Sequence, residues 1–107
     1  MLDPKVKRIE QETLEQLKFD YVPIGDVVRE FATSKSMVPT KDEFNLCLDF
    51  VKGIVTKYSL DVLEGPSMDK LPGGIDHVLD RIRLLFETEG YNAVHYRFWL
   101  HMSNDDK

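Results

Sequence analysis

The chain has 107 residues, is 42% hydrophobic and 31% charged, carries a net charge of −5, and contains one cysteine, Cys47. These values exclude a disordered chain, a disulfide-stapled fold and a general phosphate-backbone binder, and no apolar run approaches the roughly 20 residues of a membrane span. The chain begins with charged residues that lack the apolar core of a secretory signal, so we expect one cytoplasmic domain over residues 1–107 with a polar tail at 103–107.

Three helices are predicted in the first half of the chain. Residues 3–18 begin with Asp3 and Pro4 as N-cap and first helical residue, and their narrow apolar stripe indicates a peripheral helix. Residues 23–33 form a shorter second helix. The third begins after Thr40, which forms a capping box with Glu43. Its apolar residues then recur at helical spacing up to Tyr58, so we expect this helix to be central.

The second half of the chain predicts two strands around a fourth helix. Residues 59–64 alternate as a short strand, a loop rich in Gly and Pro follows, and residues 75–88 form a helix that ends before Gly90. Residues 94–102 predict a longer strand, with Tyr96, Phe98, Leu100 and Met102 on its core face. The result is an α+β fold with three to four helices packed on a small two-stranded sheet, with a winged-helix-like order as an open alternative.

The acidic excess is uneven along the chain. Residues 1–58 hold nine basic and ten acidic residues, whereas residues 59–107 hold five basic and nine acidic ones. Such a surface attracts basic partners, and a merely solvated face is the alternative. The predicted partner-binding carboxylates, opposed locally only by Lys70, are Asp61, Glu64, Asp69, Asp76 and Asp80.

The last predicted strand supplies two further candidate binding residues. Its second face places Trp99 between Arg97 and His101, and Trp and Arg are typical of binding hot spots. The alternative is that Trp99 covers the amino-terminal helix. A homodimer formed by edge pairing of this strand is also open.

Candidate catalytic and metal-binding groups are interpreted as structural. His95 and His101 would lie roughly 20 Å apart along a strand and could not share one ion. Asp76 and Asp80 share a helix face that is more simply a surface charge network, and Cys47 lies on the buried stripe of the third helix. We therefore expect no enzyme activity, no metal and no cofactor.

Two resemblances to known families follow from these patterns. The run from Val22 to Gly65 resembles the helix-turn-helix and first wing of a winged-helix domain, which implies a transcriptional regulator or adaptor. Its third helix offers Lys41, Lys52 and Lys57 but also acidic residues, which departs from the pattern of a DNA reader, so nucleic acid is not an expected partner.

The segments IDHVLDRIRLLFETEG and VHYRFWL resemble small bacterial immunity proteins of contact-dependent growth inhibition toxin systems. The resemblance covers about residues 44–102. It implies a cytoplasmic, non-enzymatic protein that neutralises a basic, nuclease-type toxin domain, as one half of a toxin and antitoxin pair. We take this as the predicted function, with no membrane partner, and keep the winged-helix regulator as the alternative.

Overall fold

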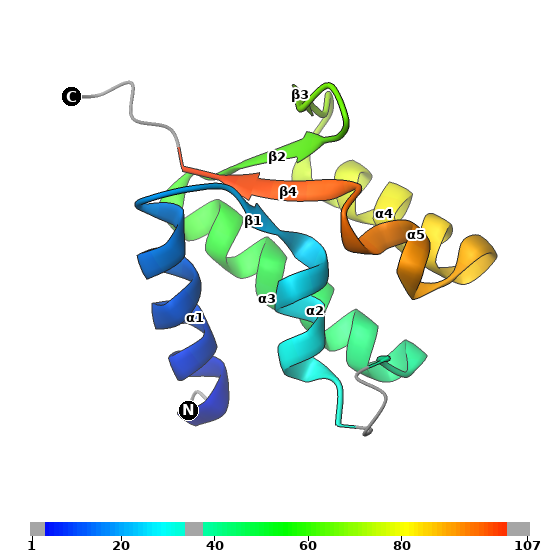
Figure 1. Cartoon of the computed structure of the whole chain (residues 1–107), viewed down its shortest axis with the longest axis horizontal. Helices are drawn as coiled ribbons and strands as arrows, with labels where there is room; N and C mark the ends of the chain where they lie inside the picture. Colours follow the sequence, from blue (N-terminus) through cyan, green and yellow to red (C-terminus); the bar gives the residue numbers. More distant parts are fainter. Residues whose placement is uncertain (1–3, 34–37, 103–107) are drawn as a thin grey trace.

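The computed structural model describes residues 4–33 and 38–102. Within these residues, an α+β fold of five helices and four strands is formed, so the predicted fold class is confirmed (Figure 1). The sheet has four strands, so the predicted two-stranded sheet is wrong. The two strands that were not predicted have only two residues each and are too short to show an alternating pattern in the sequence. The elements are α1 (Pro4–Leu17), β1 (Val22–Pro23), α2 (Ile24–Phe31), α3 (Lys41–Tyr58), β2 (Asp61–Glu64), β3 (Asp69–Lys70), α4 (Ile75–Glu89), α5 (Tyr91–His95) and β4 (Phe98–His101).

The sheet is antiparallel, with the strand order β1-β4-β2-β3. Leu100 of β4 pairs with Val22 on one side and with Val62 on the other, and all three side chains point into the core. In Figure 1 the helices pass behind and below the sheet, and the front face of the strands carries no helix. Because β4 has a neighbour on each side, it has no free edge through which two copies of the chain could pair.

Helix α3 is the centre of the core, as predicted. Thr40 Oγ1 accepts from the Glu43 amide at 3.1 Å, and the Thr40 amide donates to Glu43 Oε1 at 2.9 Å, so the capping box is present. Glu43 Oε2 also accepts from the amide of Thr33 at 3.1 Å, and thereby joins the end of α2 to the start of α3. The buried stripe of α3 consists of Phe44, Cys47, Leu48, Val51 and Ile54.

Helix α1 packs beside α2 and β1 and buries Ile9, Thr13 and Leu17. It lies at the edge of the fold in Figure 1, in agreement with its narrow stripe. The predicted N-cap Asp3 and the predicted tail at 103–107 lie outside the described residues. No helix within the described ranges is long and apolar enough to cross a membrane.

The predicted strand over residues 94–102 is shorter than expected. Val94 and His95 close the short helix α5, and the strand begins only at Phe98. Phe98 and Leu100 point into the core as predicted, with at most 1% of their surface exposed. Tyr96 precedes the strand and is 63% exposed, so its assignment to the core face is wrong.

Helix α5 sits directly on α2, at a glycine. A Cβ atom placed on Gly25 would lie 2.6 Å from both Cα and the carbonyl oxygen of His95, so only a residue without a side chain fits. The Tyr91 hydroxyl donates to the Gly25 carbonyl oxygen at 3.0 Å. This contact fixes where the chain leaves α5 and therefore where Tyr96 and β4 begin.

Candidate functional site

The open face of the sheet carries a row of rings from three segments of the chain. Tyr21, just before β1, lies with its ring centroid 4.9 Å from that of His101 on β4. Trp99 lies two residues from His101 on the same face of β4, and its ring is 6.0 Å from Tyr96. Tyr96 in turn stacks on His95 at 4.1 Å. We call this row, made of Tyr21, His95, Tyr96, Trp99 and His101, the aromatic strip.

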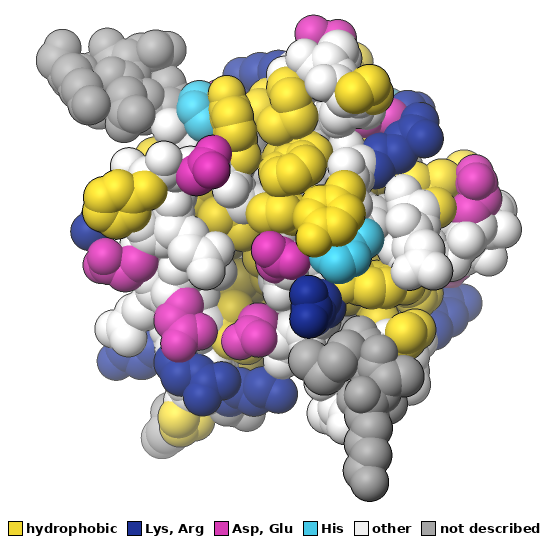
Figure 2. Space-filling model, in the orientation of Figure 1, with side chains coloured by type: hydrophobic (Ala, Val, Ile, Leu, Met, Phe, Trp, Pro, Cys, Tyr) yellow, Lys and Arg dark blue, Asp and Glu magenta, His cyan; other side chains and the backbone are white. Residues whose placement is uncertain are grey.

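Much of the aromatic strip faces solvent. Tyr21 is 43% exposed and Tyr96 is 63% exposed. Figure 2 shows hydrophobic side chains gathered in a band over the strands, with a histidine side chain at each end of the band. Trp and Tyr supply large contact area at little entropic cost, and both are enriched where proteins bind one another.

Trp99 forms the middle of the aromatic strip. Its indole ring lies against Gly65, where a Cβ atom would come within 3.2 Å of Nε1. Nε1 is buried and has no hydrogen-bond partner among the described residues. Because Trp99 is on the face opposite the helices, it does not cover the amino-terminal helix.

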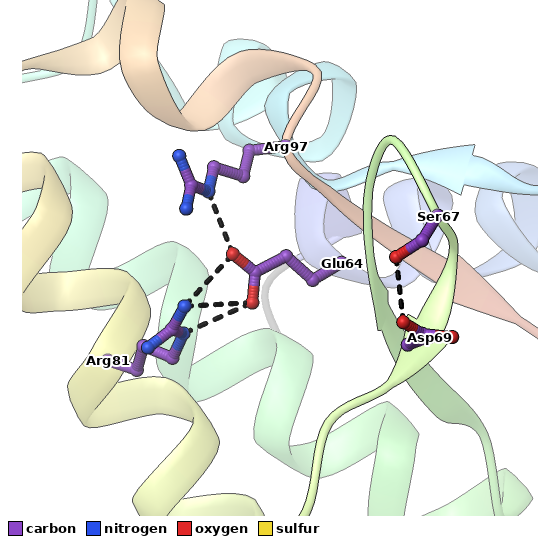
Figure 3. A network of polar contacts seen from close by, with 5 residues as sticks. All are labelled: Glu64, Ser67, Asp69, Arg81 and Arg97. Atoms are coloured by element: carbon purple, nitrogen blue, oxygen red, sulfur yellow. Dashed lines mark hydrogen bonds and ion pairs between the residues drawn. The ribbon is translucent and has the colours of Figure 1, made fainter.

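Arg97 and Glu64 are bound to each other (Figure 3). Arg97 Nε donates to Glu64 Oε2 at 2.9 Å, and Arg81 of α4 donates from both Nε and Nη2 to the same carboxylate. The Glu64 side chain is 15% exposed. Burial acts to raise the pKa of this carboxyl, but the two guanidinium groups outweigh it and hold the pKa below its ordinary value. The cluster ties β2, α4 and the start of β4 together.

The other predicted acidic residues are spread over three elements, β2, β3 and α4, and each has a polar or charged partner. Asp61 on the sheet lies 3.0 Å from Lys70 Nζ. Asp69, in β3 at the sheet edge, accepts from the Ser67 hydroxyl at 2.8 Å (Figure 3). On α4, Asp76 is 2.8 Å from Lys52 Nζ and Asp80 is 2.8 Å from Arg83 Nη1. Lys52 belongs to α3 and Asp76 to α4, so local charge counting could not find that pair, whereas Arg83 is only three residues from Asp80.

A groove between α1 and α2 was missed by the sequence analysis. Its volume is about 320 Å³, and three carboxylates and one guanidinium line it, from Glu12, Asp26, Glu30 and Arg29. Its remaining wall consists of Ile9, Thr13, Gln16, Val22 and Val27. The acidic residues lie on α1 and α2, and no local pattern indicates that these two helices pack side by side.

The groove adjoins the aromatic strip. Asp26 Oδ1 lies 3.3 Å from Nε2 of His95, which is the end of the strip nearest to α2. Figure 2 shows acidic side chains below the hydrophobic band on the same face of the molecule. One surface therefore offers apolar rings next to a pocket whose lining has an excess of negative charge.

No protein-family model matches the chain, and no curated protein or solved structure is detectably similar to it. Within the described ranges, no three His, Cys, Asp or Glu side chains are close enough together to hold a metal ion.

Proposed function

We propose that the protein is a non-enzymatic binding protein whose aromatic strip contacts a basic protein partner. The observation that carries the proposal is the open sheet face, where Tyr96 and Tyr21 are exposed beside Trp99. Apolar rings held on a rigid sheet lose little freedom when a partner covers them, so they contribute strongly to affinity.

A basic partner is supported by the charge beside the strip. Three carboxylates line the α1–α2 groove against one guanidinium, and the whole chain has a net charge of −5. Acidic residues next to an apolar contact speed the encounter with a basic surface and disfavour acidic ones. In its most specific form, the proposal is an immunity protein that neutralises a basic, nuclease-type bacterial toxin domain. The resemblance of residues 44–102 to such proteins supports it.

The winged-helix regulator is less well supported. The lysines of α3 that would meet phosphates are ion-paired within the molecule. Lys41 lies 3.4 Å from Glu87, Lys52 lies 2.8 Å from Asp76, and Lys57 lies 3.2 Å from Glu10. These ion pairs would have to break before the lysines could neutralise DNA phosphates.

The proposal expects a neighbouring gene to encode a toxic domain, and the test is binding of this chain to that domain. Calorimetry should give a dissociation constant in the nanomolar range, and Trp99→Ala and Tyr96→Ala should each weaken it by about tenfold or more. The matched control is Leu46→Ala. Leu46 is also an exposed apolar residue, with 59% of its surface exposed, but it belongs to α3 and is not part of the aromatic strip. Its affinity should equal that of the parent.

Two results would overturn the proposal. Unchanged affinity in both strip variants would show that the partner binds elsewhere. If no neighbouring gene encodes a toxic domain, or if the chain fails to protect cells that express that domain, the immunity function is wrong. Duplex DNA binding at physiological salt would favour the regulator.

A further inference from the structure

We propose that the end of the β2–β3 hairpin, residues 66–70, is a flap that covers part of the aromatic strip in the free chain and opens when a partner binds. The strip is the surface of the proposed function, so the role of the flap in binding rests on that proposal. The opening itself is a property of the free chain and is tested without a partner. Observations at Leu63, Trp99 and Met68 carry the inference.

Leu63 is covered although it lies on the open face of the sheet. Its register places it between Trp99 of β4 and Lys70 of β3, on the face opposite to Val62 and the main core. No helix of the described ranges lies over this face (Figure 1), yet Leu63 is only 7% exposed. Its cover therefore comes from Trp99 and from the hairpin.

The indole edge of Trp99 is covered at the same place. A Cβ atom on Gly65 would lie 3.2 Å from Trp99 Nε1 and 3.7 Å from Met68 Sδ, so the Met68 side chain folds back to the point where the indole edge lies. Nε1 is buried there and has no hydrogen-bond partner among the described residues. A buried donor without an acceptor costs free energy, and opening of the flap would let water satisfy it. The closed position is therefore opposed by the group that it covers.

The flap is held down weakly. Met68 has a φ of 62°, in the left-handed region that residues with a Cβ atom rarely adopt. Strand β3 consists only of Asp69 and Lys70, both exposed, and the ion pair of Lys70 with Asp61 is open to solvent on the lysine side. The hydrogen bond from Ser67 to Asp69 lies within the flap and does not tie it to the sheet (Figure 3).

The two ends of the flap are fixed by backbone hydrogen bonds. The Gly65 amide donates to the Arg97 carbonyl oxygen at 2.8 Å, and the Leu71 amide donates to the Val62 carbonyl oxygen at 3.0 Å. The segment between these bonds can move while β2 and β4 stay paired. A short segment with few buried contacts between fixed ends is the kind of element that opens locally.

Opening enlarges the apolar surface of the strip. It uncovers Leu63 and the indole edge of Trp99, so a partner that contacts this larger surface favours the open state. The apparent affinity of such a partner is reduced by the fraction of molecules in which the flap is closed. A substitution that favours opening should therefore tighten binding, even though it removes an apolar side chain beside the strip.

Hydrogen exchange in the free chain tests the opening. Trp99 is the only tryptophan of the chain, so its indole N–H resonance reports on this one place. We expect this proton to exchange faster than the amide of Leu100, at a rate that low urea leaves unchanged, because local opening suffices. Leu100 is fully buried in an interior strand, so its amide should exchange only by global unfolding. Equal rates with equal urea dependence would overturn the flap.

Met68→Ala removes the side chain that covers the indole edge. The variant should speed exchange of the indole N–H by about five- to tenfold and leave the Leu100 amide unchanged. The matched control is Leu46→Ala, which removes an exposed apolar side chain from α3 and should change neither rate. An indole rate that is unchanged in M68A, or raised equally in L46A, would overturn the inference.

Binding of the toxic domain tests the role of the flap. Calorimetry should show that M68A binds more tightly than the parent, by a factor similar to the gain in indole exchange, because the apparent affinity follows the open fraction. Unchanged or weaker binding in M68A would overturn this role. A parent chain that does not bind the domain would overturn the proposed function and with it the role in binding, whereas the exchange rates alone confirm or overturn the opening.

Discussion

The Glu64 carboxylate accepts hydrogen bonds from Arg97 at 2.9 Å and from Arg81 at 3.0 Å, so two arginines 16 residues apart share one acid. The three residues come from β2, from α4 and from the turn before β4. The carboxylate is largely shielded, whereas both guanidinium groups are about half exposed. The cluster acts as a local clamp between sheet and helix.

Replacing Glu64 by Gln should lower the free energy of unfolding by about 1 kcal/mol, because the amide cannot satisfy both guanidinium groups and the exposed ends of the pairs are screened by solvent. Urea denaturation measures the change. Asp80→Asn is the control, since Asp80 and Arg83 form an exposed pair within one helix. If D80N lowers the free energy of unfolding as much as E64Q does, the Glu64 cluster stabilises the fold no more than an ordinary surface ion pair.

The same acid makes stability depend on pH. The pKa of Glu64 is lowered from its ordinary value of 4.5 in the folded chain, so its contribution is complete above pH 4.5 and is lost as pH falls through the lowered folded pKa. The stability difference between the parent and E64Q should therefore shrink below about pH 4.5. Urea midpoints measured from pH 7 to pH 3 test this, and a constant difference would contradict it.

Tyr91 has the opposite dependence, at alkaline pH. Burial raises the pKa of its hydroxyl to about 12, from an ordinary value of 10.0. The folded chain favours the neutral phenol, so this stabilisation is complete below pH 10 and is lost as pH rises towards 12. Absorbance of the tyrosinate ion should show a step near pH 12 that is missing in Tyr91→Phe. A step that survives in Y91F would assign it to another residue.

Two glycine substitutions should act in opposite directions. Gly25→Ala places a methyl group against the backbone of His95 and should destabilise the fold by about 3 kcal/mol. Gly53→Ala in α3 meets nothing within 4 Å and should stabilise by roughly 0.5–1 kcal/mol, because alanine is the better helix former. Thermal unfolding measures both. A mild effect of G25A would mean that α5 can move away from α2.

Trp99→Phe should separate binding from stability. The indole Nε1 has no partner among the described residues, so its removal breaks no hydrogen bond there, and we expect a change in unfolding free energy of less than about 1 kcal/mol. Partner affinity should still fall, because Phe covers less area. Paired calorimetry and denaturation report both, and a large loss of stability would make W99F unsuitable for assigning function.

The elements with strong local signals were predicted correctly, and those defined by distant contacts were not. Thr40 and Glu43 are three residues apart, so the start of α3 could be read from the sequence. Glu64 and Arg97 are 33 residues apart, and nothing local indicates that they meet. Alternation from Val94 to Met102 indicated one long strand, but the fit of α5 against Gly25 keeps Val94 and His95 helical.

The candidate site divides in the same way. Trp99 could be predicted to face away from the core, because strand alternation with Phe98 and Leu100 fixes its side of the sheet. The positions of Tyr21 and of the groove residues could not be predicted from the sequence, because their neighbours depend on how α1 and β1 pack on the rest of the chain. The excess of acidic residues was correctly counted, but only the fold shows which of them are paired.

The position of β4 also sets the order of events during synthesis. The strand that joins β1 to β2 is made last, and Val22 must wait until Leu100 has been synthesised before the two can pair. Until then β1 and β2 have no common neighbour, and the aromatic strip, which depends on Trp99 and His101, does not exist. We expect the nascent chain to form its helices early and to complete the aromatic strip in a single late step.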